Sequence, residues 1–140
     1  MSGQRKIKVI FDTNIWISFL IGKRLHSIKT FITNQTLEIV LSNQLISEII
    51  LVTQREKLKK YFPKDKVDEL IAFLNAIGDF YYLKKIKNTL CRDPKDNFLL
   101  DLVEESNADY LVTGDIDLLE LKSFRTAKII KPQAFEKEVI

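Results

Sequence analysis

Four acidic side chains stand at places along the chain where a parallel α/β sheet could bring them together. Asp12 directly follows an apolar run of five residues, and Asp115 follows a second, shorter run. Asp96 stands at the start of a helical pattern, and Glu48 lies within another, beside its apolar stripe. Carboxylates without matching cations repel one another, so such a group calls for a divalent cation. Ligands that are all oxygen favour Mg²⁺ or Mn²⁺ over Zn²⁺.

Each of these acids also has a purely structural interpretation. Asp96 alone would ordinarily be a helix cap, and Asp115 with Asp117 could simply form a turn and a cap. Glu48 alone would be a solvated helix residue. Asp12 is the hardest to explain structurally, because an apolar central strand gains nothing by ending in an acid. The joint pattern therefore favours a metal site over four separate structural roles.

Strand and helix patterns alternate along the whole chain, which predicts a parallel sheet between helices. The expected strands are 7–11, 37–41, 80–83, 110–112 and 127–130. The expected helices are 15–20, 28–34, 44–53, 64–77, 97–106, 118–121 and 133–139. We expect an α/β fold, a three-layer α/β/α sandwich with a central parallel sheet of about five strands, in a single domain over 1–140. If the first and fourth strands are neighbours, Asp12, Asp96 and Asp115 meet at one edge of the sheet.

Local signals place the helix ends. Asn14 is expected to cap the first helix, and Ser42 with Asn43 opens the helix that carries Glu48. The polar stretch 54–60 is expected to continue that helix or to begin a new one. Pro63 ends this stretch, and Gly78 is expected to stop the following helix.

Composition narrows the classes of protein. The 140 residues are 46% hydrophobic and 29% charged, with a net charge of +3 that suits a polyanionic partner without identifying one. The single Cys91 and the single His26 exclude an internal disulfide and a zinc site of cysteine and histidine ligands. No apolar run approaches the ~20 residues that span a bilayer, and no signal-peptide pattern follows the first residues. We therefore expect a soluble, cytoplasmic protein.

Four segments together resemble the PIN domain, the nuclease fold of the toxins in VapBC-type toxin–antitoxin modules. The resemblance covers nearly the whole chain, and its most specific part is a strand that ends in Thr-Gly-Asp-Ile-Asp. The segments are 9–14 (Val-Ile-Phe-Asp-Thr-Asn), 45–49 (Leu-Ile-Ser-Glu-Ile), 93–100 (Asp-Pro-Lys-Asp-Asn-Phe-Leu-Leu) and 108–119 (Ala-Asp-Tyr-Leu-Val-Thr-Gly-Asp-Ile-Asp-Leu-Leu).

The resemblance implies a set of site residues. The implied catalytic acids are Asp12, Glu48, Asp96 and Asp115. The implied metal ligands are Asp12, Asp96 and Asp115, with Asp117 as an additional acid, while Glu48 binds metal or orients the attacking water. The implied supporting residues are Thr13, Asn14, Thr113 and Asp93.

The same resemblance implies the activity and the partners. It points to an endoribonuclease that depends on Mg²⁺ or Mn²⁺ and hydrolyses RNA phosphodiester bonds, as the toxin of a toxin–antitoxin module. The implied partners are an RNA substrate, a cognate antitoxin protein and a second copy in a homodimer. Apolar surfaces at 28–32 and 70–77 could support that dimer, or they could only cover the sheet.

An acidic site needs nearby cations to attract a phosphate chain. The candidates are Lys23, Arg24, 55–60, 84–87, Arg92 and Lys95. Arg92 and Lys95 are the preferred RNA-binding residues because they flank Asp96, whereas a basic run is usually a solvated face unless it borders the acids. Trp16 could stack on a base, but its position on an apolar helix face favours a place in the core.

Other functions fit the pattern less well. A haloacid-dehalogenase phosphatase needs a second Asp two residues after the first, where this chain has Asn14. A receiver domain needs an Asp after its third strand, where this chain has Lys84. A PIN-fold module that binds RNA or a partner without cleavage, and a housekeeping RNA-processing nuclease, both remain open alternatives.

Overall fold

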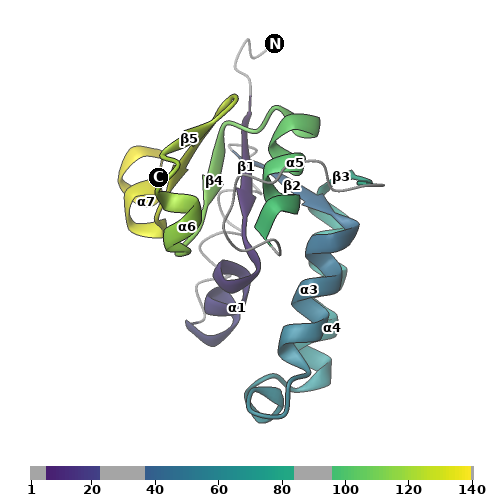
Figure 1. The fold of residues 1–140 in the computed structure, drawn as a ribbon. Coiled ribbons are helices and arrows are strands. Elements are labelled where there is room, and N and C mark those ends of the chain that lie inside the picture. The colour runs from purple at the N-terminus through teal and green to yellow at the C-terminus, as the bar shows by residue number, and fades with distance from the viewer. Residues whose placement is uncertain (1–5, 23–36, 84–95, 140) are drawn as a thin grey trace.

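The computed structural model describes residues 6–22, 37–83 and 96–139. They form one six-stranded sheet in the order β3-β2-β1-β4-β6-β5, flanked by helices (Figure 1). The strands are β1 (Ile7–Phe11), β2 (Leu37–Ser42), β3 (Asp79–Tyr81), β4 (Tyr110–Val112), β5 (Ser123–Phe124) and β6 (Ala127–Ile130). The helices are α1 (Thr13–Gly22), α3 (Asn43–Thr53), α4 (Lys64–Ile77), α5 (Asn97–Ser106), α6 (Ile116–Leu119) and α7 (Pro132–Val139), with a 3₁₀ turn η1 (Lys59–Tyr61).

The sheet is parallel except at one edge. β1 pairs with both β2 and β4, which confirms the prediction that the first and fourth strands can be neighbours in the sheet. The sheet has six strands, one more than the expected number of about five. The additional strand is β5, which pairs with β6 in the antiparallel direction at the edge of the sheet. The turn between them contains Arg125 at φ 53°, and β5 follows Lys122 at φ 63°. Turns with left-handed backbone are recognised in a sequence by Gly, Asn or Asp. Lys122 and Arg125 are none of these residues, so the sequence does not indicate the turns beside β5.

Helix boundaries mostly follow the predictions. α4 and α5 have the predicted bounds, and the stretch after α3 turns into η1 rather than continuing as an α-helix. The helix expected at 28–34 lies outside the described residues. No helix within the three described segments is long and apolar enough to cross a membrane.

The central strand β1 is covered on both faces. Phe11 points to one face, where its ring makes edge contacts with Trp16, Phe19 and Phe135, with ring centroids 5.3, 5.4 and 5.5 Å away. Lys8, three positions earlier, points to the opposite face and reaches α5 through a 3.1 Å hydrogen bond from its Nζ to the Ser106 carbonyl. Helices therefore lie on both sides of the sheet, which confirms the three-layer sandwich. Trp16 is fully buried and belongs to the core.

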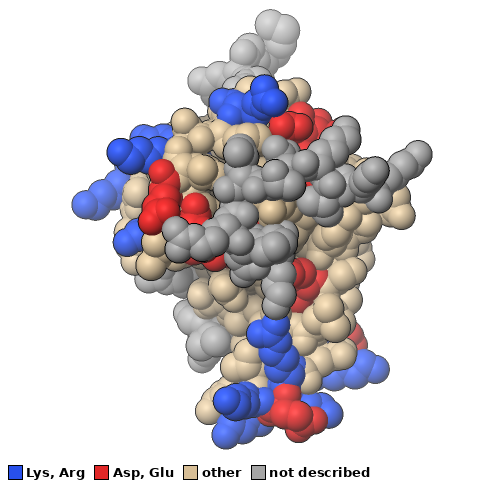
Figure 2. All heavy atoms as spheres, viewed as in Figure 1, with Lys and Arg blue, Asp and Glu red and all other residues tan. Residues whose placement is uncertain are grey.

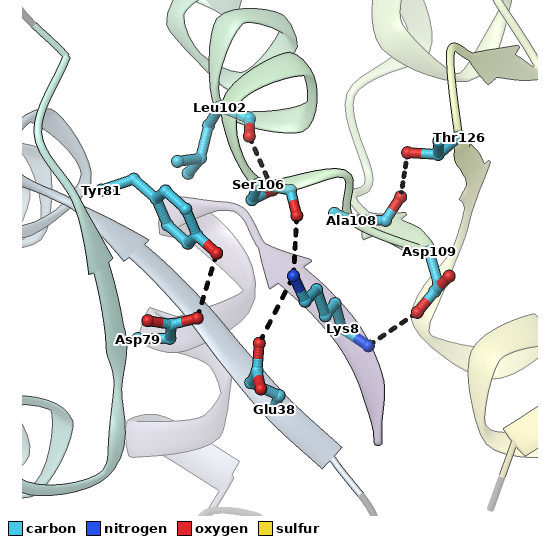
Figure 3. Close-up of polar contacts among 9 residues, drawn as sticks. All are labelled: Lys8, Glu38, Asp79, Tyr81, Leu102, Ser106, Ala108, Asp109 and Thr126. Atoms are coloured by element: carbon cyan, nitrogen blue, oxygen red, sulfur yellow. Dashed lines mark hydrogen bonds and ion pairs between the residues drawn. The ribbon is translucent and has the colours of Figure 1, made fainter. Parts of the chain in front are cut away.

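The end of the sheet opposite to Asp12 is fastened by polar contacts (Figure 3). Lys8 Nζ lies 3.9 Å from Glu38 Oε2 on β2, and the backbone N–H of Lys8 donates to Asp109 at 2.9 Å. The contact of its ammonium with Ser106 places a positive charge at the C-terminus of α5, where the helix dipole favours it. These contacts anchor β1 at its start, so that its carboxyl end is fixed relative to its neighbours.

Gly78 is required by a close approach rather than by its backbone angles. Its φ of −77° suits any residue, but an added Cβ would lie 2.1 Å from Leu41 Cδ1 and 2.7 Å from the Leu74 carbonyl oxygen. We expect Gly78→Ala to lower the free energy of unfolding by about 1–3 kcal/mol in urea denaturation. Gly114→Ala is the matched control, because nothing lies within 4 Å of an added Cβ there. Equal stabilities of the two variants would contradict this prediction.

Candidate active site

Asp12 sits at the junction of the central strand and the first helix. Its backbone N–H donates to the Val112 carbonyl at 3.1 Å, which extends the pairing of β1 and β4 by one residue. One carboxylate oxygen, Oδ1, accepts from the Ile15 N–H at 3.2 Å. Asp12 therefore caps α1, and the prediction that Asn14 is the cap is wrong. The helix begins directly after the strand, so Asn14 already lies in its first turn with an exposed side chain.

Thr113 joins the carboxyl ends of the two central strands. Its hydroxyl donates to Asp12 Oδ2 and accepts from the Asp115 N–H at 3.0 Å. Asp115 Oδ1 in turn accepts from the N–H groups of Asp117 and Leu118, at 2.8 and 3.3 Å, and so caps α6. Because Thr113 is completely buried, this chain of hydrogen bonds fixes the two aspartates relative to each other.

Glu48 reaches the same edge from α3. This helix begins after Ser42, whose hydroxyl accepts from the Leu45 N–H at 3.2 Å. Thr13 Oγ1 donates to Glu48 Oε2 at 3.0 Å, which connects the start of α1 to the middle of α3. The Glu48 side chain is therefore held beside the end of β1.

The four predicted acids line a single pocket of about 170 Å³. Its lining residues are Asp12, Thr13, Asn14, Glu48, Val52, Arg55, Asp96, Leu99 and Asp115. The acids at 12, 96 and 115 occupy the N-cap positions of α1, α5 and α6, although the Asp96 side chain makes no capping hydrogen bond. Helix N-termini carry partial positive charge, which offsets part of the repulsion between the carboxylates.

Burial raises the pKa of Asp12 above its ordinary value of 3.8. Desolvation is the largest cause, and the negative charge of Asp115 adds to it. Hydrogen bonds from Thr113 and from the backbone of Ile15 and Asn14 act in the opposite direction, since they favour the ionised form. Asp12 is only 6% exposed, so its carboxylate is the form that a bound cation would stabilise most.

Thr113→Val tests the hydroxyl bridge while keeping the shape of the side chain. The variant removes the hydroxyl that bonds to Asp12 Oδ2 and to the Asp115 N–H, so we expect the free energy of unfolding to fall by about 1–3 kcal/mol. We also expect the pKa of Asp12 to rise further, because a hydrogen bond that lowers it is lost. Urea denaturation and an NMR titration of the carboxyl group measure these effects. Thr113→Ser should keep both properties, and an unchanged Asp12 pKa in the valine variant would refute the bridge.

Some predicted residues are not brought into this pocket. Asp117 does not line it, although its N–H is bonded to Asp115. Asp93, Arg92 and Lys95 lie outside the described residues, as do the basic candidates Lys23, Arg24 and 84–87.

Arg55 lines the pocket, and in the sequence it stands out only as a member of the basic run 55–60. Glu48, Val52 and Arg55 all line it, and their spacing of four and three residues is the spacing of one helix face. Counting seven residues on from Glu48 would have identified Arg55. Arg92 and Lys95 rank above it in the sequence because they flank Asp96, and α3 itself ends two residues before Arg55, at Thr53.

A larger cavity of about 770 Å³ lies between the end of α3, η1 and α4. It is lined by apolar and polar side chains, among them Ile50, Phe62, Val67 and Asn75. A large cavity is often the first candidate for a ligand site. Here it holds no group of acids, so we assign the chemistry to the smaller pocket.

Comparisons with known proteins agree with this geometry. A family model described as PIN domain matches residues 8–117, a span that contains all four acids of the pocket. An uncharacterized protein of Methanocaldococcus jannaschii is 32% identical over 84% of this chain and 76% of its own length. The crystal structure of VapBC2 from Rickettsia felis bound to a DNA fragment from their promoter covers 88% of this chain and 97% of the solved chain. Its TM-score is 0.59 at 14% sequence identity, which is a likeness of fold.

Proposed function

This chain belongs to the PIN domain family, and we propose that it is an endoribonuclease that uses Mg²⁺ or Mn²⁺ to hydrolyse RNA phosphodiester bonds. PIN domains are generally nucleases. The observation that carries the proposal is the convergence of Asp12, Glu48, Asp96 and Asp115, far apart in sequence, on one pocket at the carboxyl edge of the sheet. Ligands of open α/β sheets bind at this edge.

The donor groups of the pocket fit a hard divalent cation. The acids offer only oxygen ligands, and the lining residues include neither His nor Cys. Within residues 6–22, 37–83 and 96–139, no three acids stand close enough to bind one ion directly. Mg²⁺ suits such a site, because it usually keeps several waters and binds through one or two carboxylates. We assign Asp12 and Asp115 as direct ligands, with Asp96 and Asp117 acting through water.

The side chains around the ion have distinct tasks. A bound ion lowers the pKa of a water and stabilises the charge that develops on the phosphate and the leaving oxygen. Thr113 holds Asp12 and Asp115 in register, since its hydroxyl bonds to both residues. Thr13 orients Glu48, and we assign Glu48 to orient the attacking water. Asn14 lines the pocket with an exposed amide that can bond to a water or a phosphate oxygen.

An RNA cleavage assay with controlled metal content tests the proposal. The purified protein is incubated with structured and single-stranded RNA in EDTA, in Mg²⁺ and in Mn²⁺. We expect internal cleavage with either ion and none in EDTA, because in the proposed mechanism the ion lowers the pKa of the attacking water and stabilises the charge on the phosphate. If RNA binds but stays intact with both ions, the protein is a binding module and the nuclease proposal fails.

We also propose that the protein is the toxin of a toxin–antitoxin module and acts in the cytoplasm. The support is the match to the PIN domain family and the likeness of fold to the solved VapBC2 structure. A cognate antitoxin would be encoded beside it, and co-expression with that neighbour should suppress cleavage. A homodimer remains part of the proposal. The apolar face of α4 at Val67, Leu70 and Leu74 is buried within the chain, and the other expected dimer surface, 28–32, lies outside the described residues.

A further inference from the structure

We propose that residues 55–61 form a binding surface for single-stranded RNA that leads away from the acid pocket, and we call this surface the basic tract. The inference rests on the proposed nuclease function and identifies how that site holds its substrate. The tract begins at Arg55, which lines the pocket, and continues through η1 to Tyr61.

Arg55 provides the connection between the acids and the tract. It lies two residues beyond the end of α3, the helix that carries Glu48, and both residues line the pocket of about 170 Å³. A guanidinium beside a group of carboxylates is suited to hold a phosphate against them, because it offers several donors in a planar fork. We assign Arg55 to the phosphate next to the one that is cleaved.

The tract is a hydrogen-bonded turn whose basic side chains are exposed. Its backbone closes on itself, since Leu58 and Lys59 both donate to the Arg55 carbonyl, at 2.9 and 2.8 Å. Phe62 is buried, and Leu58 is half-buried against the same small apolar cluster. Every other position of the tract is exposed, namely Arg55, Glu56, Lys57, Lys59, Lys60 and Tyr61.

Within the part of the chain that the structure describes, no cation of the tract forms an ion pair with an acid. Positions 55–60 carry four cations and one acid, Glu56. The ion pairs found within the described residues involve other cations, namely Lys8, Lys66, Arg125 and Lys128. Figure 2 shows blue side chains gathered around the far end of the arm that α3 and α4 form, with acidic side chains, in red, among them. The tract therefore presents positive charge beside an acidic site that would by itself repel RNA.

An aromatic ring at the end of the tract favours single-stranded RNA over a duplex. Tyr61 is 61% exposed, and Lys60 Nζ lies 5.1 Å from its ring centroid. Cations that follow a backbone, combined with a ring on which a base can stack, are the features that bind single strands with little sequence preference. A duplex would offer phosphates to the lysines but no free base to the ring.

A binding experiment that does not depend on cleavage tests the tract. The probe is a fluorescein-labelled oligouridine of about 15 nucleotides, kept in EDTA so that it is not cleaved, and its binding is followed by anisotropy. The test variant replaces Lys57, Lys59 and Lys60 with Gln. The control variant replaces Lys122, Lys131 and Lys137 with Gln, which removes the same charge from exposed positions near α6 and α7.

We expect the tract variant to bind on the order of tenfold more weakly than the wild type at about 0.1 M salt. The slope of log K against log salt should fall by about 2, because three phosphate contacts are lost. Tyr61→Ala should weaken binding by about tenfold without changing the salt slope, since stacking carries no charge. The control variant should stay within twofold of the wild type. Equal affinities and equal slopes for the tract and control variants would overturn the proposal.

Cleavage kinetics separate this inference from the proposed function. The tract variant should raise KM for a long RNA while kcat, and the rate on a dinucleotide substrate, stay unchanged. If the wild type cleaves RNA and the tract variant has the same KM, the tract fails and the nuclease stands. If the wild type binds the oligouridine through the tract but cleaves nothing, the nuclease fails and the tract stands. If an oligoglutamate peptide binds the wild type through these lysines and RNA does not, the surface belongs to an acidic protein partner and the proposal is wrong.

Discussion

Asp12→Asn should abolish metal-dependent RNA hydrolysis, with a loss of about 10³-fold or more in kcat. The substitution removes the carboxylate charge that we assign to the ion, and the ion supplies several kcal/mol of transition-state stabilisation. Asn keeps the shape and remains a good helix cap, so Oδ1 can still accept from Ile15. The measurement is single-turnover cleavage of the same RNA by both proteins in Mg²⁺.

The same variant should be at least as stable as the wild type when no metal is present. Because the folded pKa of Asp12 is raised above 3.8, the folded state binds this proton more tightly than the unfolded state does. The wild type should therefore lose stability as the pH rises from about 4 through the folded pKa, and Asp12→Asn should lack that loss. In EDTA at pH 7 we expect its Tm to equal or exceed that of the wild type by about 2–4 °C.

Metal should reverse this order of stability. A cation that binds only the folded wild type raises its Tm, whereas the variant lacks the charge that binds it. Thermal unfolding in EDTA and in Mg²⁺ measures both effects. Full activity of Asp12→Asn, or the same Mg²⁺ shift in both proteins, would show that Asp12 is not a ligand.

Phe11→Ala should cause the largest loss of stability among the substitutions considered. Phe11 is 1% exposed, and its ring is the common neighbour of Trp16, Phe19 and Phe135. Removing it opens a cavity between β1, α1 and α7. We expect the free energy of unfolding to fall by about 3–5 kcal/mol, measured by urea denaturation with the slope m unchanged.

Phe11→Leu is the control for this cavity. Leu keeps most of the apolar volume, so we expect a loss below about 1.5 kcal/mol. A loss of less than 1 kcal/mol for Phe11→Ala would mean that the aromatic cluster closes around the gap. The assignment of Phe11 as the centre of this core layer would then be wrong.

The layers and the central strands could be predicted because their signals are local and strong. β1, β4 and β6 have the bounds that their apolar runs predict, and each run is bordered by polar or turn residues. β5 could not be predicted, because its two residues form a strand only by pairing with β6. Strand pairing of this kind is tertiary, and a window of the sequence does not contain it.

The candidate site shows the same division between local and tertiary information. The acids could be named in advance, since each stands at the end or on the face of a recognisable element. Whether Asp12 or Asn14 caps α1 could not be decided, because two polar residues close together offer equal signals and the helix start is set by the end of β1. The hydrogen bonds of Thr113 link Asp12 to Asp115 only because β1 pairs with β4. No local pattern in the sequence predicts this link.

The double use of Asp12 has a consequence for how this sequence can diverge. The residue starts α1 through its hydrogen bond to Ile15, and in the proposed mechanism its carboxylate also binds the ion. A descendant that no longer catalyses the reaction would not need a charged side chain at this position. It would still need a side chain that caps the N-terminus of α1. We expect such descendants to carry Asn, Ser or Thr at this position and to avoid Ala or Leu. Loss of the acid would then mark a change of role in a protein that still folds, and it could be recognised in a genome before any assay.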